Sequence, residues 1–150
     1  MGSRFPFSPF PDGWYLACFS DELKRGKLVT KTFMGKEVII YRGRKGEPCV
    51  ADAFCPHLGA HIGKGGCVKD GAVVCPFHGF RFDADGDCVD TPYGPAPAKA
   101  RLKTWPVREF DGLVMAYYDA EGRAPSWEIE DKDPAGWSEL THHTLRVKGH

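Results

Sequence analysis

The sequence predicts an all-β protein, arranged as a basal antiparallel β-sandwich with a smaller subdomain inserted into it. The 150 residues include 18 Gly and 12 Pro, a composition typical of turn-rich β proteins rather than of helical bundles. Short apolar runs alternate with glycine-containing turns along most of the chain, as expected of consecutive antiparallel strands. The length suits a single domain, and the 42% hydrophobic content is enough for a buried core.

The first half of the basal sandwich is expected within residues 10–50. A Pro-Asp-Gly turn at residues 11–13 precedes the first apolar run, and Ser20 and Gly26 cap a short helical turn. A glycine turn at residues 35–36 joins the next two strands into a hairpin. The expected elements are a strand over 14–19, a helical turn over 20–25, strands over 27–34 and 37–41, and a strand over 49–54.

The inserted subdomain is expected over about residues 51–97, and the chain then returns to the basal sandwich over residues 98–120. The expected elements of this half are strands over 72–74, 80–82 and 88–89, an irregular segment with three prolines over 91–97, and a closing hairpin of 101–109 with 113–118. Beyond residue 122 the composition is that of a linker. Residues 141–148 alternate apolar and polar side chains, which indicates a strand with no visible partner.

The charge balance excludes several classes of partner. Twenty acidic and twenty basic residues give a net charge of zero, so nothing indicates a nucleic acid or an anionic membrane as the partner. No apolar run approaches the length of a membrane span, and no secretory leader is recognisable. We therefore expect a cytoplasmic protein without a membrane span.

Two short stretches carry the residues that can ligate a metal. Cys55 and His57 are separated by one residue, Cys75 and His78 by two, and residues 58–74 lie between the pairs. A Rieske [2Fe–2S] cluster requires this set, because two thiolates hold one of its irons and two imidazoles hold the other. In each stretch a Pro follows the Cys and a Gly lies just beyond the His. This pattern favours tight loops whose backbone N–H groups turn toward the cluster sulfurs.

A structural zinc module is the alternative from a different class of protein. Zinc sites usually combine a Cys-x-x-Cys pair with a separate pair of His residues, whereas both pairs here are mixed. Cys-x-His is also a poor tetrahedral chelate, and two such loops arising among ordinary buried residues would be a large coincidence. Colour separates the two hypotheses, since a Rieske protein is brown-red and a zinc protein is colourless.

The remaining cysteines and the nearby histidine have simpler interpretations. Cys18, Cys49, Cys67 and Cys88 each lie beside apolar residues, so we expect small buried hydrophobic side chains rather than disulfides in a reducing compartment. His61 is expected to make a hydrogen bond or face water, because the cluster already has its four ligands.

At these residues the sequence resembles a known family. The stretches Cys55-Pro-His-Leu-Gly-Ala-His and Cys75-Pro-Phe-His-Gly-Phe resemble the Rieske motif of non-haem iron oxygenases. The resemblance extends from residues 11–15 through 92–93 and 104–106 to Trp137. It is greatest with the steroid-oxidising, cholesterol 7-desaturase-like branch.

The resemblance implies a Rieske fold over residues 1–122, with residues 123–150 as a linker and the start of a catalytic domain that the chain does not contain. It implies that Cys55, His57, Cys75 and His78 bind the [2Fe–2S] cluster, and that electrons leave through His78. In the family, the segment that matches residues 91–97 is a third loop that covers the cluster.

The resemblance also implies a role in electron transfer. Such a domain takes single electrons from a reductase or ferredoxin and passes them to a mononuclear non-haem iron oxygenase centre. The Asp-x-x-His-x-x-x-x-His stretch that holds this iron in the family is absent from all 150 residues, so we expect the oxygenase active site to lie outside this chain. The alternative is a free-standing, low-potential Rieske ferredoxin.

The residues around the cluster predict a low reduction potential. Respiratory Rieske proteins resemble this pattern but carry an extra Cys in each loop, where this chain has Ala60 and Phe77. They also place Ser and Tyr hydroxyl donors where this chain has Phe80 and Phe82. Without these donors the added electron is less stabilised, so we predict a potential of roughly −150 mV, near the low end of the Rieske range.

Overall fold

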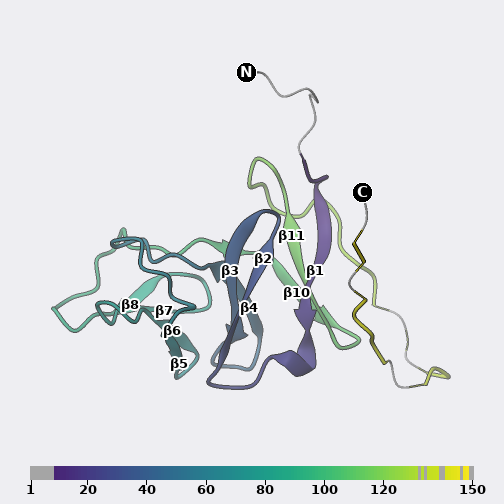
Figure 1. Cartoon of the computed structure of the whole chain (residues 1–150), viewed down its shortest axis with the longest axis horizontal. Helices are drawn as coiled ribbons and strands as arrows, with labels where there is room; N and C mark the ends of the chain where they lie inside the picture. Colours follow the sequence, from purple (N-terminus) through teal and green to yellow (C-terminus); the bar gives the residue numbers. More distant parts are fainter. Residues whose placement is uncertain (1–8, 132, 134, 139–140, 146, 149–150) are drawn as a thin grey trace.

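The computed structural model describes residues 9–131, 133, 135–138, 141–145 and 147–148, and it confirms the all-β class. The strands form three antiparallel sheets, two in a basal part and one set apart from them in the view of Figure 1. The first basal sheet has the order β1 (Gly13–Phe19), β11 (Leu113–Tyr118), β10 (Val107–Phe110). The second has the order β2 (Leu28–Phe33), β3 (Lys36–Arg42), β4 (Pro48–Asp52), β9 (Thr104–Trp105). The third has the order β5 (Cys67–Lys69), β6 (Ala72–Val74), β7 (Arg81–Phe82), β8 (Cys88–Asp90).

The second sheet separates two hydrophobic cores. Successive side chains of a strand point to opposite faces, so a strand buried on both faces contributes to two cores. In β3, Val38 and Ile40 pack with the first sheet, whereas Ile39 and Tyr41 pack with the third sheet. All four side chains are fully buried. The middle sheet therefore supports the basal sandwich on one face and the inserted subdomain on the other.

An ion pair joins the two basal sheets near their edge. Arg42 at the end of β3 donates to both carboxylate oxygens of Glu109 in β10, at 2.6 and 2.7 Å. The same guanidinium also donates to the carbonyls of Ser20 and Gly46. These hydrogen bonds fix the β3–β4 turn and η1 (Ser20–Glu22) against β10.

Three hairpins in three different sheets turn through the same two-residue geometry. Their turn residues are Met34-Gly35, Asp70-Gly71 and Asp111-Gly112, with positive φ at both positions. Positive φ at both central residues is the signature of a type I′ turn, whose twist matches that of the flanking strands. The first hairpin thus turns at residues 34–35, one residue before the expected position.

The structure corrects four other expectations. Residues 101–109 do not form one strand, because Pro106 lacks an N–H and separates β9 from β10, which lie in different sheets. The short strand β5 was not expected, and the helical turn covers only Ser20–Glu22, as a 3-10 turn. The described residues of the 141–148 segment form no strand.

Candidate metal centre

Two loops at one end of the inserted subdomain present the predicted ligands. In each loop the Cys N–H donates to the carbonyl five residues later, Cys55 to Ala60 and Cys75 to Phe80, both at 2.9 Å. In each loop the Gly four residues after the Cys donates back to the Cys carbonyl, at 2.9 Å from Gly59 and 3.1 Å from Gly79. The loops therefore close in the same way, although their His residues lie at different spacings from the Cys.

The structure brings the four predicted ligands together. Cys55 and Cys75 are 3% and 2% exposed, and the Cys55 thiol lies within hydrogen-bonding reach of the Cys75 sulfur. The imidazole rings of His57 and His78 lie next to each other, with centroids 5.0 Å apart. His57 is exposed and His78 is half-buried. The two thiols thus lie in the core, and the two imidazoles lie between them and solvent.

Burial sets the chemistry of the first thiol. Burial, helped by the neighbouring Cys75, raises the pKa of Cys55 to about 11, although the backbone N–H of His57 donates to the Cys55 sulfur and acts in the opposite direction. The free thiol is therefore protonated at neutral pH, and binding of a metal must release that proton. The same N–H is positioned to stabilise negative charge on the sulfur once it is a ligand.

Aromatic side chains surround the imidazoles. Phe80 is buried and stacks on the His57 ring, with ring centroids 4.5 Å apart. The ring centroids of Phe77 and His78 are 3.9 Å apart. Tyr93 of the third loop lies 6.1 Å from the His78 ring and is 72% exposed. These contacts shield parts of both rings, while Tyr93 and Phe77 remain open to a partner.

The third loop packs directly on the second ligand loop. A Cβ added to Gly79 would lie 2.8 Å from Cγ of Pro92, so the backbone there approaches the proline ring closely. Gly79 also has φ +68°, a conformation that favours glycine. Pro92 and Tyr93 of the third loop therefore lie against the second ligand loop.

The donor set fits a two-iron cluster better than a single ion. No group of three or more His, Cys, Asp and Glu side chains in the described part of the chain is arranged to hold one metal ion. The four donors form instead a buried pair of sulfurs and an outer pair of imidazoles. A [2Fe–2S] cluster spreads its ligands in this way, with one pair on each iron.

His61 packs away from the ligands. Its side chain is 9% exposed, its Nε2 lies 3.3 Å from Oε1 of Glu37 in β3, and its ring meets Phe54 edge-on. The contact with Glu37 does not have hydrogen-bond geometry, and Nδ1 has no partner among the described residues. The expectation that His61 makes a hydrogen bond or faces water is therefore wrong, because neither ring nitrogen has a hydrogen-bond partner among the described residues and the side chain is largely buried.

The other cysteines follow the expectation only in part. All six cysteines are free, so the structure contains no disulfide between described residues. Cys18 and Cys49 are buried, as expected, but Cys88 is half-buried and Cys67 is exposed. The apolar neighbour Val68 did not predict burial of Cys67, because consecutive side chains of a strand point to opposite faces of the sheet.

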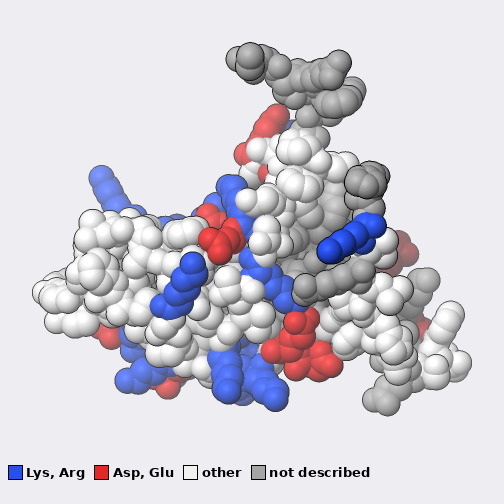
Figure 2. Space-filling view, viewed as in Figure 1, with Lys and Arg blue, Asp and Glu red and all other residues white. Residues whose placement is uncertain are grey.

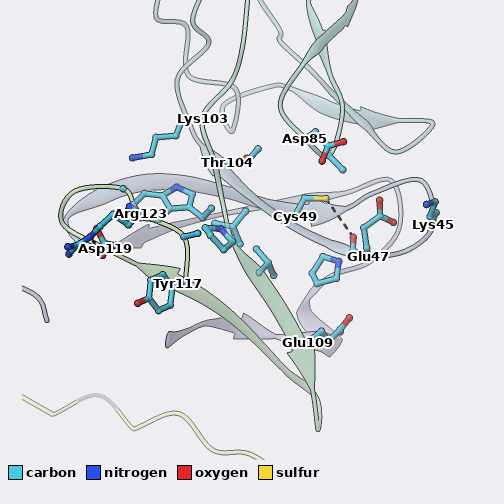
Figure 3. Close-up of a pocket in the computed structure, with 18 residues that line it drawn as sticks. Lys45, Glu47, Cys49, Asp85, Lys103, Thr104, Glu109, Tyr117, Asp119 and Arg123 are labelled. Atoms are coloured by element: carbon cyan, nitrogen blue, oxygen red, sulfur yellow. Dashed lines mark hydrogen bonds and ion pairs between the residues drawn. The ribbon is translucent and has the colours of Figure 1, made fainter. Parts of the chain in front are cut away.

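A cavity of about 880 Å³ is lined mainly by residues of the basal part, together with Ala84 and Asp85 of the inserted subdomain, and by none of the four donors. Figure 3 shows side chains of both charges around it, including Lys45, Glu47, Asp119 and Arg123. Cys49 donates from Sγ to the Glu47 carbonyl at its edge. The cavity is therefore separate from the metal centre.

Sequence reasoning did not find two contacts of the site. These are the stacking of Phe80 on His57 and the close approach of Pro92 to Gly79. In both stretches a Gly stands four residues after the Cys, and this shared spacing was the one signal in the sequence for the matching loop closures. Nothing in the sequence indicated which rings would stack.

Comparisons with known proteins agree with this geometry. The Rieske [2Fe–2S] domain family matches residues 13–106. The cholesterol 7-desaturase nvd of Bombyx mori is 43% identical over 132 residues, which cover 87% of this chain and 29% of that protein. This chain thus spans about a third or less of the cholesterol 7-desaturases that it matches.

Solved structures show the same fold. Apo dicamba monooxygenase superposes with a TM-score of 0.69 at 30% identity, over 79% of this chain and 37% of that one. A chain in the reduced complex between oxygenase and ferredoxin in carbazole 1,9a-dioxygenase superposes with a TM-score of 0.61 at 27% identity, over 69% of this chain and 28% of that one. In the described residues, no helix has the length and apolarity needed to cross a membrane. The chain belongs to the Rieske [2Fe–2S] domain family and is homologous, over most of its length, to part of the cholesterol 7-desaturases.

Proposed function

We propose that this domain holds a [2Fe–2S] cluster through Cys55, His57, Cys75 and His78 and passes single electrons to a mononuclear non-haem iron oxygenase centre outside the chain. A reductase or ferredoxin supplies the electrons. The observation that carries the proposal is the arrangement of the four donors, with two buried sulfurs behind two adjacent imidazoles in loops closed by matching hydrogen bonds.

The residues of the chain have distinct tasks in this function. When bound, a Rieske cluster takes up and gives back one electron. The two loop closures hold the sulfurs at fixed positions, and the His57 N–H stabilises the charge on the Cys55 sulfur. Burial of both cysteines keeps water from the sulfur side. His78, which contacts the exposed Phe77 and Tyr93, provides the route by which electrons leave.

The partners are inferred from the relatives. The carbazole 1,9a-dioxygenase structure is described as a complex between oxygenase and ferredoxin, which supports a ferredoxin-type donor here. The relatives are about three times longer than this chain, and the stretch that would hold a mononuclear iron is absent from it. Both facts support an acceptor centre outside these residues.

The alternative is a free-standing, low-potential Rieske ferredoxin, and one observation favours it. Residues 123–131 are joined to the basal sheets, because Arg108 pairs with Glu128 and Asp131, and Trp14 donates to the carbonyl of Trp127. A segment held in this way can serve as part of the domain rather than as a linker. An Asp-x-x-His-x-x-x-x-His stretch encoded after residue 150 would decide for the oxygenase.

Metal analysis tests the proposal directly. The purified, cluster-loaded protein is expected to be brown-red and to contain iron and acid-labile sulfide in equal amounts. Cys75→Ala should lose both, because it removes one of the two buried sulfurs that lie together at the site. Cys67→Ala, which removes an exposed cysteine, is the matched control and should keep both. A colourless protein with zinc and no sulfide would overturn the proposal.

A further inference from the structure

Five exposed basic residues gather on two neighbouring turns, and we call them the basic rim. Lys24, Arg25 and Lys27 lie in the loop between η1 and β2, and Arg44 and Lys45 lie in the β3–β4 turn. Figure 2 shows Lys and Arg atoms gathered along the lower edge of the molecule, where Figure 1 places the η1–β2 loop. A chain with no net charge therefore carries a concentrated positive surface.

The basic rim is not neutralised by the protein itself. None of its five side chains forms an ion pair with a described carboxylate, whereas bases elsewhere do, such as Lys31 with Glu22 and Arg101 with Asp87. Like charges held close together repel, and a free surface of this kind lowers the stability of the fold unless an oppositely charged partner covers it. The unpaired charge therefore points to a partner.

A hollow at the rim connects it to the inserted subdomain. Its volume is about 320 Å³, and its walls are Arg25, Arg42 and Arg44 on the basal side and Val68, Asp70 and Gly71 on the other. Gly71 packs against the backbone of Arg44 with no room for a Cβ. The two parts of the domain thus touch at this point.

The far wall of the hollow leads directly to a predicted ligand. Gly71 is followed by β6, and β6 ends one residue before Cys75. At about 3.3 Å per residue, the chain covers roughly 13 Å from the hollow to this cysteine. A protein that docks on the rim therefore lies beside the strand that leads to this cysteine.

The chemistry of the rim favours an acidic protein over other anions. All five cations are exposed and spread over two turns, and the largely buried Arg42 in the wall of the hollow is already paired with Glu109, so the hollow is not built for one phosphate. Stacking platforms for nucleic acid bases are also missing from its walls. Extended, exposed charge of one sign acts mainly by steering an oppositely charged protein into place.

We propose that the basic rim is the docking surface for an acidic electron-donor protein, an inference that rests on the proposed function. Long-range attraction raises the rate of encounter, and the apolar surface near His57 and His78 stays free for the acceptor. The rim thereby separates the entry of electrons from their exit.

Stopped-flow reduction tests this inference. The probe is an acidic plant-type [2Fe–2S] ferredoxin, whose potential of about −400 mV makes transfer to a Rieske centre favourable. Arg25→Glu with Arg44→Glu should lower the second-order rate constant about tenfold or more at low ionic strength. The difference should nearly vanish at about 0.5 M salt, where charges are screened over a few ångströms.

The control carries the same change in charge at another place. Lys36→Glu with Lys103→Glu alters two exposed lysines near Trp105, at the opposite end of β3, and should change the rate less than about twofold. Thermal unfolding of all variants verifies the fold. Equal rates for the two double variants, or a wild-type rate that does not depend on salt, would overturn the docking surface.

Two further measurements separate this inference from other outcomes. Reduction by dithionite, which needs no docking, must be normal in every variant; its failure in the wild type would overturn the proposed function instead. Flotation with phosphatidylserine vesicles tests a membrane as the occupant. Vesicle binding that Arg25→Glu with Arg44→Glu abolishes, with no effect on the reduction rate, would assign the rim to a membrane and overturn the inference.

Discussion

At the scale of single residues, the identity of the outer ligands sets the reduction potential. Neutral imidazoles leave the cluster less negative than four thiolates would, so replacing one by a thiolate should stabilise the oxidised form. His78→Cys is therefore expected to keep its iron and sulfide while its potential falls below the value of roughly −150 mV predicted for the wild type. A redox titration followed by visible absorbance measures both proteins.

The same titration offers a control at a histidine that the structure places elsewhere. His142 stacks on Phe19, with centroids 3.6 Å apart, and its substitution by Cys should leave the potential unchanged. An unchanged potential in His78→Cys would show that this residue is not a ligand. A wild-type potential above about +100 mV would instead contradict the role given to the missing hydroxyl donors at Phe80 and Phe82.

Residue types alone were enough to propose a metal centre, because cluster chemistry restricts them so strongly. Two Cys and two His in mixed pairs have few other uses, so Cys55, His57, Cys75 and His78 could be selected without a structure. The environment of His61 could not be predicted in the same way. Its contact with Glu37 joins a loop to a strand of another sheet, and such pairings depend on how the sheets pack.

At the scale of elements, the two ligand loops provide a matched pair of glycines. Gly59 and Gly79 have φ of +72° and +68° and occupy the same position in their loops, but only Gly79 has a neighbour within 4 Å of an added Cβ. Gly59→Ala should cost about 1 kcal/mol of stability, from backbone strain alone. Gly79→Ala should cost about 1–3 kcal/mol more, since the Pro92 ring must move.

Denaturant unfolding of the cluster-loaded variants measures this difference, and the loss of visible absorbance reports the cluster at the same time. Faster bleaching in Gly79→Ala than in Gly59→Ala is expected, because the third loop must shift away from the second ligand loop. Equal effects of the two substitutions would contradict the close packing of that loop on Gly79.

The ion pair between the basal sheets makes stability depend on pH. Hydrogen bonds from Arg42 hold the pKa of Glu109 below its usual value of 4.5. A carboxylate with a lowered pKa stabilises the folded state above its unfolded pKa, and this contribution is lost as the pH falls through the folded pKa. Because the Glu109 side chain is 29% exposed, solvent screening limits the contribution to about 1 kcal/mol.

Glu109→Gln should therefore be about 1 kcal/mol less stable than the wild type at pH 7, and this difference should shrink as the pH falls below 4.5, the usual pKa of a Glu. Urea unfolding across this range measures the difference. Glu121→Gln, which changes an exposed partner of Arg123, is the control and should stay within about 0.5 kcal/mol of the wild type. A difference for Glu109→Gln that does not change with pH would mean that packing, not charge, is responsible.

Strands were easier to predict than their sheet partners. The hydrophobic pattern identified the regions of β1, β2, β3, β6 and β11 within a residue or two. It failed at residues 101–109, where only Pro106 separates β9 from β10 in sequence but the two strands belong to different sheets. It also missed β5, whose three residues carry too little pattern to separate a strand from a turn.

At the scale of the whole molecule, the double burial of β3 explains how the inserted subdomain is held. One face of this strand packs in the basal core, and the other packs in the core that contains Cys55 and Cys75. A substitution at Ile40 and one at Ile39 therefore act on different cores, although the residues are neighbours in sequence. The ligand loops rest on a sheet that the basal sandwich itself supports.

The domain as a whole is expected to accept electrons but not to oxidise a substrate. The four donors account for one cluster, and no other group of metal-binding side chains is present in the described part of the chain. Titration of the cluster-loaded protein with dithionite under argon should thus take up one electron for each cluster. Supplied with reductant, oxygen and cholesterol, the same protein should yield no oxidised sterol by mass spectrometry. Formation of such a product would mean that an oxygen-activating centre lies within these 150 residues, and the electron-transfer role would have to be abandoned.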